Sequence, residues 1–194
     1  MGKLANVHKG VSCVYYGLFL IVGTILVAFV GGGVLMVSPA VGAVLVLGVV
    51  PIMFIAGTIL GLVGRIMCLS VPDDFSAVGV IYAAVICDVT VVLISAAGWI
   101  VDLPELVSSL SSLLTLASTI LFLVFLMKIS AYIDDNASLQ RAGNVLLLLI
   151  ATFVVVIVGV FLPPLLIVVL LMVIVGFIMY VLLLMGLMKS LKAA

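Results

Sequence analysis

The amino-acid sequence predicts an all-α fold: a polytopic bundle of six transmembrane helices, with both termini in the cytoplasm. Of its 194 residues, 68% are hydrophobic and 7% are charged, and the mean hydropathy is +1.71. Ordinary soluble domains are about 45–50% apolar and about 25% charged. Six long apolar runs and a one-sided distribution of lysine and arginine point the same way. Because nearly every residue is needed to cross the bilayer, residues 1–194 are expected to form a single integral membrane domain.

Each of the six apolar runs reaches the length of about 20 residues that a membrane-spanning helix requires. In the first run, the three consecutive glycines at 31–33 are expected to weaken or bend the helix. Ser38 and Pro39 predict a tight hairpin into the second run. Pro51 should kink that second helix, because it removes a backbone hydrogen bond. The expected spans are 11–37, 40–64, 76–101, 106–127, 143–162 and 165–188.

The basic residues predict the orientation of the bundle. Six crossings from a cytoplasmic N-terminus leave both tails and the second and fourth connections inside. The outer turns contain only the acidic residues Asp102 and Glu105. This asymmetry follows the positive-inside rule and predicts a multi-pass protein of the cell membrane with cytoplasmic termini. The inner segments hold every lysine and arginine of the chain: Lys3, Lys9, Arg65, Lys128, Arg141, Lys189 and Lys192.

Asp88 is the one ionisable residue expected inside an apolar run. It lies about 13 residues from either end of span 76–101, which places it near the bilayer midplane. A carboxylate at that depth is costly, should face the bundle interior and is a functional-site hypothesis by default. Arg65 is assigned to the connection that follows span 40–64, so no cation is expected within reach of Asp88. The carboxyl is therefore expected to be protonated or hydrogen-bonded to hydroxyl groups.

The fourth span supplies such hydroxyl groups. Its serines and threonines recur at spacings of three and four, so they follow one face of a helix. Matching depths across the short turn between the third and fourth spans sets Asp88 opposite Thr119 and Ser95 opposite Ser112. The shared stripe is interpreted either as a close helix contact or as a path for protons or solute. Its members are Asp88, Ser95, Ser112, Thr115, Ser118 and Thr119.

Glycines in the second span form a small-xxx-small motif. Gly57 and Gly61 are four residues apart, and Gly64 follows one turn later. Small residues at this spacing let membrane helices approach closely. The motif predicts helix packing within the bundle or at a homodimer interface.

Several residue types and motifs that cofactor binding or catalysis would require are absent from the sequence. His8, the single histidine, lies in the N-terminal tail, so the chain cannot hold an intramembrane haem between two histidines. No lysine falls inside a span, and no zinc-protease, nucleophile-elbow or phosphate-loop motif occurs. We therefore expect no cofactor, no metal site and no catalytic set. Net charge is zero and no basic patch suggests nucleic acid as a partner.

Three functional hypotheses follow, with the lipid bilayer as the environment in each. The leading hypothesis is a non-enzymatic structural, assembly or accessory subunit, whose partners would be further copies of itself or other membrane subunits. The alternative is a small proton-coupled transporter or channel that uses Asp88. An intramembrane enzyme would need a second catalytic group beside Asp88, and none is visible. A water-filled cavity that reaches Asp88 would favour the transporter, whereas a dry, closely packed seam would favour the structural protein.

Overall fold

A computed structural model describes residues 2–72, 75–98, 100–101, 104–159, 162 and 164–193; Asp102 lies outside this part. The described residues contain no strand, and six of their helical segments are long and apolar enough to cross a membrane. The prediction of an all-α six-helix bundle is confirmed. The elements are α1 (Gly2–Val37), α2 (Pro39–Ala43), η1 (Val44–Val49), α3 (Val50–Met67), α4 (Val78–Gly98), α5 (Glu105–Tyr132), α6 (Asn136–Gly159) and α7 (Leu165–Ala193).

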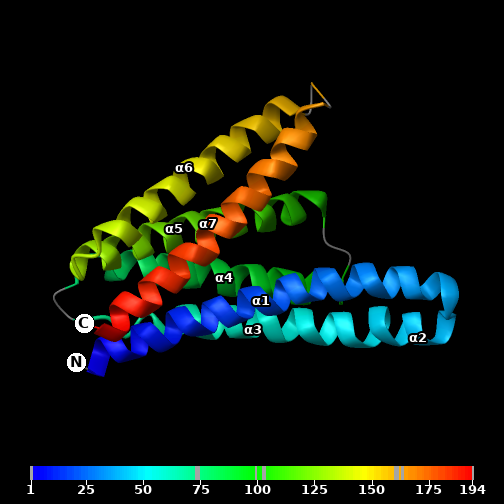
Figure 1. Ribbon diagram of the computed structural model, residues 1–194, viewed down its shortest axis with the longest axis horizontal. Coiled ribbons are helices and arrows are strands. Elements are labelled where there is room, and N and C mark those ends of the chain that lie inside the picture. The colour runs from blue at the N-terminus through cyan, green and yellow to red at the C-terminus, as the bar shows by residue number, and fades with distance from the viewer. Residues whose placement is uncertain are drawn as a thin grey trace.

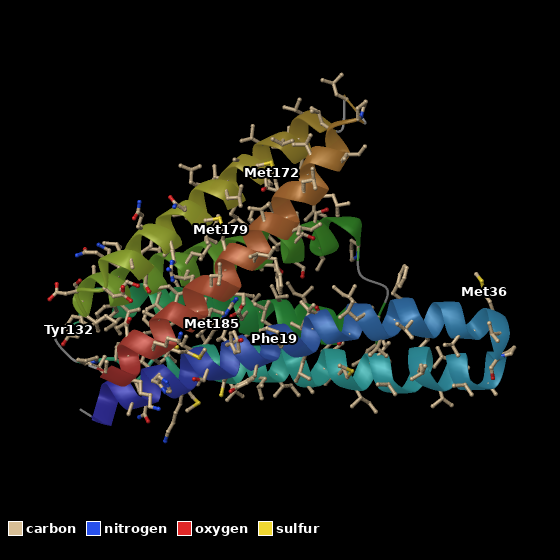
Figure 2. The ribbon with its side chains drawn as sticks, in the orientation of Figure 1. Phe19, Met36, Tyr132, Met172, Met179 and Met185 are labelled. Carbon is tan, nitrogen blue, oxygen red and sulfur yellow. The ribbon has the colours of Figure 1, made fainter. Side chains whose placement is uncertain are left out.

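The described helices form antiparallel hairpins that pair α1 with α3, α4 with α5, and α6 with α7. Further packing of α5 on α6, of α1 on α7 and of α3 on α4 joins these hairpins into one bundle. Both termini lie at the same end of the bundle (Figure 1). From that end α6 and α7 slope away from the α1–α3 hairpin, which projects past the other helices (Figure 1). Met36 marks its projecting tip (Figure 2). The bundle is thus closed at the end with the termini and splayed at the other.

The buried apolar core lies in the closed half of the bundle. It comes from the beginning of α1, the segment between α3 and α4, the first half of α4, the second half of α5, the beginning of α6 and the end of α7. Lipid chains are as apolar as leucine, so the far half can leave its apolar side chains toward the membrane without cost. The largest fully buried side chains are Phe122, Phe125, Ile81, Leu123, Leu126, Ile129, Leu183, Leu184 and Leu187.

Glycines bring the backbones of α1 and α3 into direct contact. A Cβ atom added at Gly64 would lie 2.6 Å from the carbonyl oxygen of Gly10, and one at Gly57 would lie 2.9 Å from that of Gly17. Gly61, between them, has no other atom within 4 Å of its added Cβ. The Cβ positions of two glycines of the motif are therefore closed off by α1. Gly61 meets α1 only through its backbone, because its nitrogen would lie 2.9 Å from a Cβ added at Gly17.

The first helix is not interrupted at its triple glycine. α1 is helical throughout its 36 residues, about 54 Å at 1.5 Å per residue, so the helix continues through residues 31–33, where a weak or bent segment was expected. The physical reason is tertiary contact: a Cβ at Gly31 would lie 2.9 Å from a methyl carbon of Val46. The close approach of η1 compensates for the low helix propensity of glycine at this point.

The irregularity expected at Pro51 takes the form of a π-helical turn. Residues Pro39–Met67 form one uninterrupted helical segment, and η1 ends at Val49, two residues before Pro51. The N–H of Val50 donates to the carbonyl of Leu45, five residues back. A proline removes one donor from the helix ladder, and a π turn re-registers the neighbouring hydrogen bonds.

At the closed end, Asp135 ties the connection between α5 and α6 to α7. Its carboxylate accepts hydrogen bonds from the backbone N–H of Ser138 at 3.0 Å and from the Ser190 hydroxyl at 2.6 Å. Partial desolvation acts to raise the pKa of Asp135, but the hydrogen bonds from Ser138 and Ser190 outweigh it and hold the pKa below 3.8. Asp134 beside it adopts a left-handed backbone conformation with φ 55°. These contacts fix the turn that leads into α6.

Candidate functional site: an intramembrane ion pair beside two cavities

Asp88 has a basic partner, Arg65, which contradicts the expectation that no cation reaches it. Asp88 is the eleventh of the 21 residues of α4, at the middle of that helix. The Nη1 atom of Arg65 lies 2.7 Å from Oδ1 and 2.5 Å from Oδ2 of Asp88. Each side chain is 18% exposed. Opposite charges that are largely removed from bulk solvent attract each other more strongly than they would in water.

Ser118 of α5 completes the cluster. Its hydroxyl accepts a hydrogen bond from Nη1 of Arg65 at 2.7 Å and donates to Oδ1 of Asp88 at 2.5 Å. The carbonyl oxygen of Ala84 lies 3.1 Å from the same hydroxyl. Ser118 is fully buried. The cluster thus joins α3, α4 and α5, which belong to two different hairpins.

An aromatic row lies between the ion pair and the closed end. The guanidinium carbon of Arg65 is 4.8 Å from the ring centroid of Phe122, a cation–π distance. Phe122 stacks on Phe125, Phe125 meets Phe75 at 5.8 Å, and Phe75 meets Tyr132 at 5.7 Å. Tyr132 lies at the same end as the termini in Figure 2. The three buried phenylalanine rings therefore separate Arg65 from that end of the molecule, where Tyr132 is exposed.

Two cavities adjoin the ion pair on the splayed side. The first, about 280 Å³, is lined by Arg65 and Asp88, and its other walls come from α1, α3, α4, α5 and α7. The second, about 340 Å³, is lined by Arg65 and by residues of α1, α5, α6 and α7. Leu18, Arg65 and Tyr180 line both cavities. Arg65 therefore stands between them, and Asp88 faces the first.

The predicted polar stripe is only partly assembled. Depth matching set Asp88 opposite Thr119, and the observed partner on α5 is the preceding residue, Ser118. Thr115 lines the first cavity and Thr119 the second. Both threonine hydroxyls donate to carbonyls one turn back in their own helix. Ser95 and Ser112 are exposed on the outer half of the bundle and belong to neither cavity.

Arg65 is the functional residue that sequence reasoning missed. Its assignment to a connection came from ending the second span at Gly64, but α3 continues to Met67. A signal was present, because no proline follows until Pro72 and nothing at Gly64 compels the helix to stop. Residues Val71 and Phe75 of the following segment are buried, so the chain re-enters the closed core before α4 begins. The long arginine side chain carries its charge from the end of α3 to the middle of α4.

The site consists of one ion pair, Arg65 and Asp88, and one serine hydroxyl that is hydrogen-bonded to both. Among the described residues, no three His, Cys, Asp or Glu side chains come together as a metal site would need. Removing one partner of a buried ion pair costs about 3–5 kcal/mol. The intact pair therefore holds the helices together, and loss of either charge would weaken their contact. No protein-family model, curated protein or solved structure matches the chain.

Proposed function

We propose that this multi-pass membrane protein is a small, non-enzymatic, proton-coupled transporter whose working group is the Arg65–Asp88 pair. The observation that carries the proposal is the cavity of about 280 Å³ that this pair lines. An intramembrane charge that faces a cavity is typical of proton and solute pathways. A purely structural pair would gain nothing from an adjoining cavity, because voids forfeit packing contacts.

Protonation of Asp88 is the proposed coupling step. A proton that reaches the carboxylate through the cavity neutralises it and removes the charge that holds Arg65. The contact between α3 and α4 then weakens, since their direct packing is sparse apart from this pair. Two arrangements of the hairpins, with the ion pair made or broken, are what a coupled carrier requires.

The alternative, a structural or accessory subunit, draws support from the same cluster. The three side chains satisfy one another and join α3, α4 and α5. Under that hypothesis the pair is permanent and carries no protons. The two functions differ in one measurable property, which is proton movement that depends on Asp88.

We expect purified protein in proteoliposomes to move protons in response to a pH gradient, as reported by a pH-sensitive dye inside. Asp88→Asn should abolish this flux, because an amide cannot bind and release a proton in this range. Asp134→Asn is the matched control: Asp134 is an exposed aspartate at the closed end, and its left-handed conformation suits asparagine.

Correct folding of each variant is checked by size-exclusion chromatography and helical circular dichroism. Flux that is the same in wild type, Asp88→Asn and empty liposomes would contradict transport and leave the structural role.

The proposed orientation has cytoplasmic termini in the cell membrane. With Arg65 inside the bundle, six cations remain in segments at the end that carries the termini (Figure 1). In a background with the three native cysteines replaced by alanine, an impermeant maleimide added to intact cells should label Val101→Cys but not Ala137→Cys. Both positions are exposed. Labelling at 137 and not at 101 would reverse the orientation.

A further inference from the structure

We infer that the transported solute is a monocarboxylate with an apolar tail, bound through the free edge of Arg65 while the proton occupies Asp88. This inference rests on the proposed function and names its substrate class. It comes from three features of the described residues: unused guanidinium donors, the charge balance of the site, and the apolar walls of the two cavities.

The first feature is the half-used guanidinium. The hydrogen bonds of Arg65 with Asp88 and Ser118 all use a single nitrogen, Nη1. No hydrogen bond from Nη2 or Nε is found within the described part of the chain, which also contains no buried side-chain nitrogen or oxygen without a partner. These two nitrogens are therefore accessible, and Arg65 lines both cavities. An open edge with two N–H groups is the geometry that binds a carboxylate in a bidentate manner.

The second feature is charge. The empty site is neutral, with one cation and one anion, and among the described residues Arg65 is the only basic group that lines either cavity. Tyr180 of α7 is the other titratable side chain found there. Apart from Arg65, Asp88 and Tyr180, the described wall residues of α1, α3, α4, α5, α6 and α7 are apolar residues, glycines or threonines. An anion alone would leave the site negative in a low-dielectric medium. When one proton neutralises Asp88 as one carboxylate binds Arg65, the site stays neutral, whereas a dianion would not balance.

The third feature is the wall of each cavity. Apart from the polar groups already named, the walls of the second cavity are leucine, valine, methionine, phenylalanine and glycine side chains, with Thr152 the one further hydroxyl. Pockets of this kind bind an apolar body and use a few polar groups to orient it. Leu18 and Tyr180 flank Arg65 in both cavities, so a tail can extend from the guanidinium into either.

Binding is tested with radiolabelled octanoate on full-length protein in nanodiscs, by equilibrium dialysis against empty nanodiscs. From about pH 6 to about pH 8 the octanoate is ionised, so any pH effect arises in the protein. Wild-type affinity should fall by up to about tenfold per pH unit, since one proton is taken up with each ligand. Asp88→Asn should bind at least as tightly as wild type at low pH and lose the pH dependence, because Arg65 is already free.

Arg65→Gln should weaken binding by about tenfold or more, the effect of losing a charged hydrogen-bonding group. Arg141→Gln is the matched control, because Arg141 is the other arginine and lies exposed near the closed end. Octanol and octylammonium, with the same tail but no negative charge, should not compete. If Arg65→Gln does not fold, the double variant Arg65→Gln/Asp88→Asn removes both charges and should also fail to bind.

Two results would overturn the inference: equal competition by octanol, or octanoate binding with the same affinity at every pH in wild type. Its failure is separable from that of the proposed function. Proton flux through Asp88 that octanoate neither needs nor stimulates would retain the transporter and reject this substrate class. Proton-linked octanoate binding without any flux would retain the site and reject transport.

Discussion

Replacing Arg65 with glutamine is expected to lower the free energy of unfolding by up to about 3–5 kcal/mol, the cost of leaving a fully buried charge without its partner, because the Asp88 side chain is only 18% exposed. Asp88 would keep Ser118 as a hydrogen-bond donor but would lose its counter-charge. Part of the loss is relieved by proton uptake, so Arg65→Gln should be more stable at low pH than at neutral pH. Asp88 would then be neutral, as the linkage between proton binding and folding requires.

A double-mutant cycle isolates the pair. Arg65→Gln/Asp88→Asn removes both charges and should be more stable than Arg65→Gln alone, with an interaction energy of about 0.5–3 kcal/mol. Arg141→Gln, an exposed arginine, should change stability by less than about 0.5 kcal/mol. Unfolding by denaturant in mixed micelles provides the measurement. Equal effects of Arg65→Gln and Arg141→Gln would mean that the ion pair does not stabilise the bundle.

Substitution of Gly64 with alanine should destabilise the protein by about 1–3 kcal/mol, the usual range for overpacking. The added Cβ would lie 2.6 Å from the Gly10 carbonyl oxygen and 2.7 Å from the Val14 backbone nitrogen. Both are backbone atoms of α1, so the whole helix would have to move. Arg65, the next residue, would move with α3, and the ion pair with Asp88 would be strained as well.

Gly61→Ala is the matched control within the same motif. Nothing outside its own helix turn lies within 4 Å of the added Cβ, so the change should be neutral or stabilising by up to about 1 kcal/mol through helix propensity. The same unfolding assay compares the two variants. If Gly61→Ala proved as damaging as Gly64→Ala, the α1–α3 contact described here would be wrong.

The six-helix architecture could be read from the sequence because the bilayer constrains it directly. Each span must carry about 20 apolar residues, and every backbone polar group must be satisfied within a helix. The same constraint made Asp88 conspicuous, because a carboxylate in an apolar run has to be compensated. Matching depths across the turn between the third and fourth spans predicted Thr119 as the partner of Asp88, one residue from the observed Ser118, because the rise per residue of a helix is fixed. These features depend on local chemistry and regular geometry alone.

The partner of Asp88 depended on the tertiary structure. Arg65 enters the bundle because α3 runs three residues past Gly64 and the next segment folds into the core. The lack of a stop signal at Gly64 allowed the helix to continue, but the local sequence does not determine that the next segment folds into the core, since helix ends depend on the packing that follows them. Ser95 and Ser112 match each other in depth and continue the polar stripe, yet both are exposed, because helix rotation is set by neighbours rather than by periodicity. Gly61 and Gly64 differ for the same reason. The spacing identifies both as small residues, but only the position of α1 decides that a Cβ at Gly64 would clash and that a Cβ at Gly61 would not.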